Sequence, residues 1–115
     1  MFNGIIFNKG IVNRIKKSDK GVNIFVKSNL KVKKKDLGIS ICCDGVCLTM
    51  VSLKNKIMEF YLLKETMNRS KFKNISIGDK INLELPLKYG QKISGHLCQG
   101  HVDCTSKVNR IIHKG

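Results

Sequence analysis

Two polar side chains within one apolar run are spaced to share a face. Cys47 and Thr49 are two positions apart in residues 46–51, where apolar residues predominate and a strand is expected. Because side chains at i and i+2 point to the same side of a strand, the thiol and the hydroxyl would line one wall of a pocket. Thr66 offers a second hydroxyl that can donate and accept hydrogen bonds. The plain alternative for Cys47 is a small buried apolar side chain.

Histidine is the residue type best suited to proton transfer near neutral pH, since its unperturbed pKa is about 6.5. The chain has His96, His101 and His113, and the Gly-His-Val-Asp stretch at 100–103 makes His101 the preferred candidate. Ser40, between Ile39 and Ile41, is the candidate hydroxyl beside the Cys47 thiol. A structural histidine and an outward-pointing serine are the alternatives.

A metal site is the other chemistry that these residue types allow. His96, Cys98, His101 and Cys104 are all zinc-ligand types within nine residues. Their spacing is not that of a zinc knuckle, and four ligands on one extended segment cannot surround a metal without a sharp loop. We therefore expect no metal.

Cysteine usage and hydropathy bear on location. The five cysteines are an odd number, and Cys42 and Cys43 are adjacent. The start of the chain runs directly into a patterned strand without a secretory leader, so reduced thiols in the cytoplasm are expected. The apolar runs are shorter than the ~18–20 residues of a membrane helix, so a soluble protein with no membrane partner is expected.

The formal net charge of +14 suggests nucleic-acid binding. However, lysine supplies nearly all of the positive charge, and only three arginines could make bidentate contacts to phosphate or guanine. Aromatic residues, which stack on single strands, make up 6% of the chain. The dense basic run at residues 31–36 is expected to be a solvated loop rather than an anion-binding surface. A basic nucleic-acid-binding barrel is therefore only the third alternative.

The periodicity predicts six strands and one short helix in an antiparallel barrel or sandwich. Asp44 and Gly45 separate two apolar runs and predict a tight hairpin, because both residues tolerate the positive φ of a type I′ turn. Residues 65–72 lack strand alternation and predict the helix. The expected strands are residues 10–15, 22–26, 39–43, 46–51, 56–62 and 80–85.

Residues 4–15 are similar to residues 100–111 at a constant offset of 100 − 4 = 96, and Val-Asn-Arg-Ile recurs intact. A repeat of this length predicts a first domain over residues 1–95 and a second copy that begins at His96 and covers residues 96–115. The second copy would contain only its first strand, at about residues 106–112. We expect that strand to lack partners of its own, and the natural chain to be longer.

Five blocks in register resemble the riboflavin synthase alpha-chain family. They are Met-Phe-Asn-Gly-Ile-Ile at 1–6, residues 38–49 with Asp-Gly-Val-Cys-Leu-Thr, Lys-Glu-Thr at 64–66, residues 78–84 with Asn-Leu-Glu, and Ser-Gly-His at 94–96 with Gly-His-Val-Asp at 100–103. Two departures affect local loops: Leu85 stands where the family usually has arginine, and Ser94 where it usually has glycine.

The resemblance implies a six-stranded antiparallel Greek-key barrel with one short helix, followed by the first strand of a second, truncated barrel. It implies the dismutation of two 6,7-dimethyl-8-ribityllumazine molecules to riboflavin and 5-amino-6-ribitylaminouracil, with no cofactor or metal. The implied catalytic residues are Ser40, Cys47 and His101. The implied substrate-binding residues are Gly4, Ile5, Ile6, Cys47, Leu48, Thr49, Tyr61, Leu62, Leu63, Lys64, Glu65, Thr66, Gly100, His101 and Val102.

The resemblance also implies partners. Family members carry two barrels in tandem, and each active site lies between barrels of neighbouring subunits in a homotrimer. For the fragment alone a dimer is the expected assembly, and lumazine synthase is a further candidate partner. The main alternative is a non-catalytic lumazine- or flavin-binding protein of the same fold, which turnover would distinguish.

Overall fold

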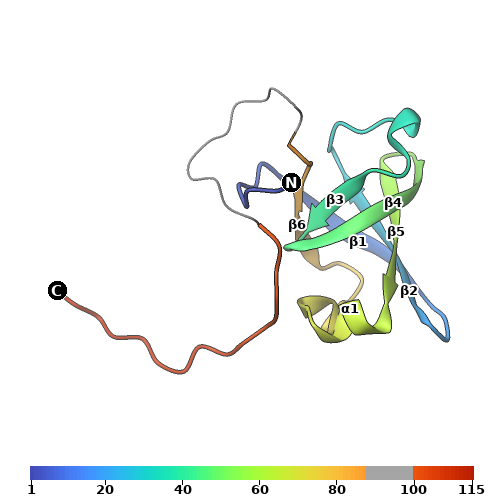
Figure 1. The fold of residues 1–115 in the computed structure, drawn as a ribbon. Helices are drawn as coiled ribbons and strands as arrows, with labels where there is room; N and C mark the ends of the chain where they lie inside the picture. Colours follow the sequence, from blue (N-terminus) through green and yellow to red (C-terminus); the bar gives the residue numbers. More distant parts are fainter. Residues whose placement is uncertain (88–99) are drawn as a thin grey trace.

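The computed structural model describes residues 1–87 and 100–115, and in this part of the chain six antiparallel strands form a closed barrel (Figure 1). The strand order around the barrel is β1-β2-β5-β4-β3-β6. The six predicted strands are thereby confirmed. The strands are β1 (Asn8–Lys17), β2 (Gly21–Ser28), β3 (Ser40–Cys43), β4 (Val46–Lys54), β5 (Ile57–Leu63) and β6 (Lys80–Glu84).

The barrel interior is filled by the apolar side chains that alternate along each strand. Phe60 and Ile24 are fully buried at the middle of their strands. Phe72 lies in a 3-10 turn outside the strands, and its side chain is also fully buried in the core. The remaining core residues are Val12, Val22, Val26, Leu30, Ile41, Cys43, Leu48, Met50, Met58, Leu62, Ile81 and Leu83.

Two hairpin turns use left-handed backbone. Asp44 and Gly45 have φ of 47° and 83°, as a type I′ turn requires, and they join β3 to β4. Asn55 and Lys56 have φ of 52° and 63° and join β4 to β5. The second turn carries no glycine, so its residue types predict a tight turn less clearly than Asp44 and Gly45 do.

The prediction of one helix over residues 65–72 was wrong in detail. The structure has α1 (Lys64–Asn68) and a separate 3-10 turn, η2 (Lys71–Asn74). The Ser70 hydroxyl accepts a hydrogen bond from Phe72 N–H and donates one to the Thr66 carbonyl, so it ends one turn and begins the next. The break lets Phe72 turn into the core. A further 3-10 turn, η1 (Lys34–Asp36), lies in the basic run, whose lysines are exposed.

The predicted strand at residues 106–112 does not form. Residues 101–115, here called the C-terminal tail, contain no helix or strand and are exposed (Figure 1). A strand is stable only when its backbone groups pair with another strand, and all six barrel strands already have two neighbours. The predicted domain boundary at residues 95 and 96 lies outside the described residues. No helix in the described ranges is long and apolar enough to span a membrane.

Candidate functional site

The outer face of the β3–β4 hairpin carries four short polar side chains. Ser40 lies opposite Thr49, and Cys42 lies opposite Cys47, while the residues between them fill the core. Residues directly opposite in an antiparallel pair point to the same face, so the two pairs form one small patch. Cys47 and Thr49 are exposed there and Ser40 is half-buried. The sequence prediction that Cys47 and Thr49 share a face is thus met.

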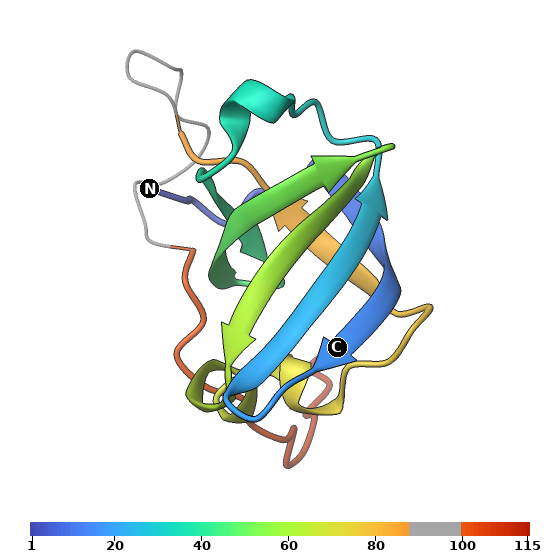
Figure 2. The same cartoon turned by 90° about the vertical axis from the view of Figure 1, so that its right-hand side faces the viewer.

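The pairing between β4 and β5 ends at Met50 and Phe60, next to a bulge, and no register pair in the described ranges continues it toward the start of β4. Figure 2 shows the two strands diverging from their shared hairpin toward α1. Consequently residues 46–49 pair only with β3, and residues 61–63 pair only with β2. The barrel has an open seam at this place.

Backbone groups of residues 47–49 on β4 and of residues 61–63 on β5 face this seam. Met50 directs its N–H and C=O toward Ile39 and Gly38, on the β3 side. Because successive residues of a strand present their peptide groups to opposite edges, those of Cys47 and Thr49 point toward β5. The bonds that Lys56 and Lys64 make to the β2 side place Tyr61 and Leu63 facing β4 by the same alternation.

The remaining predicted residues of β5 and α1 differ in what they can offer. Leu62, like Leu48 on β4, is buried in the core, so neither side chain can contact a ligand outside the barrel. Tyr61 and Leu63 are exposed on the outside of β5. Thr66 is half-buried, and Lys64 and Glu65 are exposed at the start of α1.

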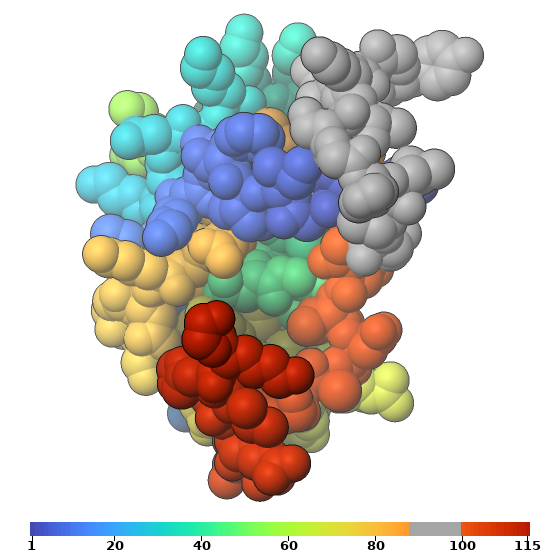
Figure 3. All heavy atoms as spheres, turned by 90° about the vertical axis from the view of Figure 1, so that its left-hand side faces the viewer, coloured from blue at the N-terminus to red at the C-terminus, as the bar shows by residue number. Residues whose placement is uncertain are grey.

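The N-terminal segment, residues 1–6, and a crossing segment, residues 100–102, lie together against the outer face of β3 and β6 and the β3–β4 turn. Gly100 N–H donates to the Phe2 carbonyl at 2.7 Å, and Val102 N–H donates to the Gly45 carbonyl at 2.6 Å. The His101 ring lies 5.6 Å from the buried Phe2 ring, centroid to centroid. Figure 3 shows the face, with green β3–β4 atoms between the blue N-terminal segment and the orange start of the tail.

The thiols of the hairpin have different surroundings. Burial, followed by the negative charge of Glu84, raises the pKa of Cys42 to about 11. Burial, followed by the neighbouring Cys42, raises the pKa of Cys43 well above its ordinary value. Both thiols therefore stay protonated at neutral pH, and neither is a nucleophile there. Cys47 is the exposed thiol of the hairpin.

The structure thus brings the predicted segments 4–6 and 100–102 together beside the β3–β4 hairpin that carries residues 47–49, whereas residues 61–66 lie beyond the seam, on β5 and α1. His96 and Cys98 lie outside the described residues, and the described residues contain no cluster of three or more metal-ligating side chains. Sequence reasoning missed Glu84, whose carboxylate binds the backbone of the N-terminal segment. Glu84 is buried although its side chain lies on the outside of the barrel, and the sequence alone does not show that the N-terminal segment covers it.

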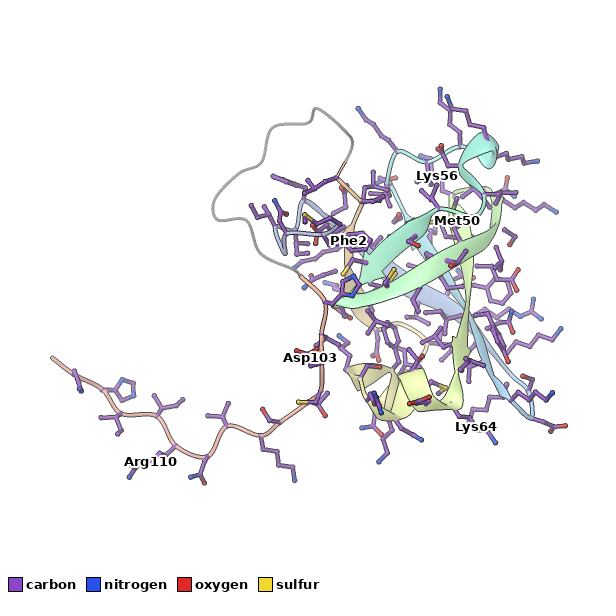
Figure 4. The ribbon with its side chains drawn as sticks, in the orientation of Figure 1. Phe2, Met50, Lys56, Lys64, Asp103 and Arg110 are labelled. Carbon is purple, nitrogen blue, oxygen red and sulfur yellow. The ribbon has the colours of Figure 1, made fainter. Side chains whose placement is uncertain are left out.

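A cleft of about 370 Å³ lies at the end of the barrel formed by the β4–β5 hairpin, away from the seam. Lys56 marks that end and Lys64 the opposite end in Figure 4. None of the predicted site residues lines it. Its walls are formed by Ser28, Leu30, Val32, Lys34, Leu53, Lys54, Asn55, Lys56 and Met58.

A barrel of the same fold occurs in solved proteins complexed with flavin and lumazine ligands. The family model described as the lumazine binding domain matches residues 3–86, and the chain belongs to this family. Among its curated relatives, the riboflavin synthase of Brucella abortus is 37% identical over 113 residues, covering 94% of this chain and 56% of the relative.

A second riboflavin synthase and two solved structures are also similar to this chain. The riboflavin synthase of Bacillus subtilis is 30% identical and matches 99% of this chain and 53% of its own length. The crystal structure of LumP complexed with flavin mononucleotide is 26% identical, with a TM-score of 0.67, and covers 84% of this chain and 55% of LumP. LumP complexed with 6,7-dimethyl-8-ribityl lumazine gives 26% identity and a TM-score of 0.62, over 75% of this chain and 49% of LumP. The chain spans about half the length of these proteins.

Proposed function

We propose that this chain binds 6,7-dimethyl-8-ribityllumazine, and its product riboflavin, at the β4–β5 seam. The single observation that carries the proposal is the end of the β4–β5 register at Met50 and Phe60. It leaves the peptide groups of Cys47 and Thr49 directed into a gap that no strand within residues 1–87 or 100–115 fills. Backbone donors and acceptors are rarely left without partners, so a ligand or water must meet them.

The ligand has the matching chemistry. The uracil-like edge of the lumazine presents carbonyl and N–H groups in alternation, as the edge of a strand does. Thr49 adds an exposed hydroxyl beside these peptide groups, and Thr66 adds a half-buried hydroxyl in α1, the helix that follows β5. A flat ring that enters the seam would be held by the backbone rather than by any single side chain.

The proposed reaction transfers a four-carbon unit from one lumazine to another. It yields riboflavin and 5-amino-6-ribitylaminouracil and needs no external oxidant or reductant, because one molecule is oxidised as the other is reduced. His101 is proposed to accept a proton from the ring methyl group, since histidine titrates near neutral pH. Cys47 or Ser40 is proposed as the group that adds to the ring, and Cys47 is the more exposed of the two.

The proposed reaction needs a second lumazine site in addition to the seam of this barrel. Two lumazines must meet face to face, and this barrel offers one seam. We propose that the second site comes from a barrel of a neighbouring subunit, in a homotrimer. Lumazine synthase, which makes this substrate, is the proposed partner in the cell, and the cytoplasm the proposed location.

The alternative is a binding protein without turnover. The observation in its favour is the similarity to LumP, whose structures hold flavin mononucleotide and 6,7-dimethyl-8-ribityl lumazine. Both functions use the same seam, so binding alone does not separate them.

Two measurements test the proposal in sequence. Titration of the protein into 6,7-dimethyl-8-ribityllumazine or riboflavin should quench or shift the ligand's fluorescence. No spectral change at high micromolar protein would refute binding at the seam. Incubation with the lumazine should then produce riboflavin if the chain is catalytic, whereas binding without riboflavin formation would establish the alternative.

A further inference from the structure

Glu84 is a buried carboxylate on the outside of the barrel. It lies on β6 directly opposite Cys42 of β3, while its neighbour Leu83 points into the core opposite Cys43. Cys42 in turn lies opposite Cys47, so Glu84, Cys42 and Cys47 form a row across three strands on the outer face. Glu84 is only 6% exposed although it is outside the core, because the N-terminal segment covers it.

The carboxylate is satisfied by backbone amides. Its Oε2 atom accepts a hydrogen bond from Asn3 N–H at 2.8 Å, and its Oε1 atom accepts one from Gly4 N–H at 3.1 Å. Gly4 N also lies 3.3 Å from Oε2. Among the described residues, no lysine or arginine lies within ion-pair distance of it. Hydrogen bonds to an ionised acceptor are stronger than neutral ones, so this pair of bonds can fix two consecutive residues in place.

The position of Gly4 then determines the position of the crossing segment. Gly4 has φ of +82°, and its backbone lies against Gly100 so closely that a Cβ on Gly100 would be 2.7 Å from Gly4 N. Gly100 also bonds to Phe2, whose ring contacts His101. On the other side, the Cys42 thiol lies 3.9 Å from the Gly100 carbonyl oxygen, directly above the row. Figure 4 shows Phe2 beside the start of the segment that leads to Asp103.

We propose that Glu84 is a positioning residue that anchors residues 2–4 and, through them, places the crossing segment and His101 beside the β3–β4 hairpin, next to the open seam. Its consequence for ligand binding rests on the proposed function, whereas the anchoring itself does not. The carboxylate acts through Gly4 and Gly100 and does not itself contact the ligand.

The test compares three variants. Glu84→Leu removes both acceptors, Glu84→Gln keeps one oxygen that can accept from Asn3 and Gly4, and Glu59→Leu is the control. Glu59 is a half-buried glutamate on β5, and within the described part of the chain its carboxylate accepts hydrogen bonds from the side chains of Asn23 and Ser52 and from no backbone amide. Loss of Glu59 should therefore perturb the barrel without moving the N-terminal segment.

The first readout is amide hydrogen exchange of Asn3 and Gly4 without ligand. Exchange should accelerate by about tenfold or more in Glu84→Leu, less in Glu84→Gln, and not at all in Glu59→Leu, because only the first removes both acceptors. In Glu84→Gln, the Gly4 amide proton should also lose the downfield shift of a bond to a carboxylate, which tests the contact even if Glu84→Leu does not fold. Unchanged exchange and an unchanged shift would overturn the anchoring.

The second readout is the dissociation constant for 6,7-dimethyl-8-ribityllumazine. It should rise about tenfold in Glu84→Leu, recover to within about threefold of the parent in Glu84→Gln, and stay unchanged in Glu59→Leu, since a misplaced crossing segment loses its contacts. Accelerated exchange with unchanged affinity would overturn the positioning role. If the parent protein binds no lumazine, the proposed function fails, and the exchange data still decide whether Glu84 anchors the segment.

Discussion

Gly4 and Gly100 lie backbone against backbone, although 96 positions separate them. A Cβ on Gly100 would be 2.7 Å from Gly4 N and 3.0 Å from Gly4 Cα. The same offset relates the two halves of the repeat predicted from the sequence, so the contact joins two equivalent positions of that repeat. Glycine is required at Gly100 for space, and at Gly4 for its φ of +82°.

Substitution of Gly100 by alanine should separate the two segments. The three atoms that the new Cβ would meet are Gly4 N, Gly4 Cα and Asn3 C, and because all of them belong to the backbone none can rotate away. The lumazine dissociation constant is expected to rise several-fold, while Tm changes by less than about 2 °C because Gly100 lies outside the strands. Gly115→Ala, which meets nothing within 4 Å, is the control. Equal affinity of the parent protein and Gly100→Ala would show that the contact does not matter for binding.

The hydroxyl of Thr49 is the second position to test. Thr49→Val keeps the shape of the side chain and removes its hydrogen bond, so it should weaken lumazine binding by about 0.5–1.5 kcal/mol, or roughly 2- to 12-fold. Fluorescence titration measures the change. Thr105→Val in the exposed tail is the matched control. An unchanged dissociation constant would make Thr49 a residue of the strand surface only.

Two phenylalanines should differ sharply in their effect on folding. Phe60 is fully buried at the centre of the core, whereas Phe7 is 84% exposed. Phe60→Ala should lower the free energy of unfolding by about 3–5 kcal/mol, and Phe7→Ala by less than about 0.5 kcal/mol. Urea denaturation followed by circular dichroism measures both. A large loss in Phe7→Ala would mean that Phe7 packs against another surface.

The strands were predictable because their core residues alternate locally, and Asp44-Gly45 located one hairpin by its residue types alone. The Asn55–Lys56 turn was harder to find, since neither residue is glycine although both have positive φ. The break of the predicted helix at Ser70 depends on a side-chain hydrogen bond that the helical pattern does not reveal.

The candidate site was predictable only in part. The shared face of Cys47 and Thr49 follows from the strand period, whereas the other segments came from the resemblance to a family. The open seam depends on where the β4–β5 register ends, which is a property of the barrel as a whole. Glu84 binds Asn3 and Gly4, which precede it by 81 and 80 positions. No local sequence pattern indicates hydrogen bonds over such a distance along the chain.

The Cys42 thiol should make stability depend on alkaline pH. Its pKa rises from an ordinary 9.0 to about 11 on folding, mainly through burial. The folded state therefore holds the proton more tightly, so this contribution to stability is complete below pH 9 and is lost as the pH rises toward 11. Tm measured from pH 8 to 11 should fall more steeply in the parent protein than in Cys42→Ser. Cys104→Ser, which removes an exposed thiol, should follow the parent. Parallel curves for all three proteins would contradict the raised pKa.

Residues 104–115 of the C-terminal tail should be dispensable for folding and for binding, whereas the crossing segment before them should be needed for binding. Val108, Ile111 and Ile112 are 80%, 71% and 65% exposed, so the tail adds little to the core. A chain that ends at Asp103 keeps the bond from Val102 to Gly45 and the contact between His101 and Phe2.

That chain should keep the parent's urea midpoint, and its lumazine dissociation constant should stay within about twofold, since no contact of the seam is removed. A chain that ends at residue 99 should also fold, because all six strands precede it, but it should bind the lumazine at least several-fold more weakly. The difference between the two chains isolates residues 100–103. If the chain ending at Asp103 failed to fold, the tail would be part of the domain, and the predicted boundary at His96 would be wrong. If both chains bound equally well, the crossing segment would have no part in the site.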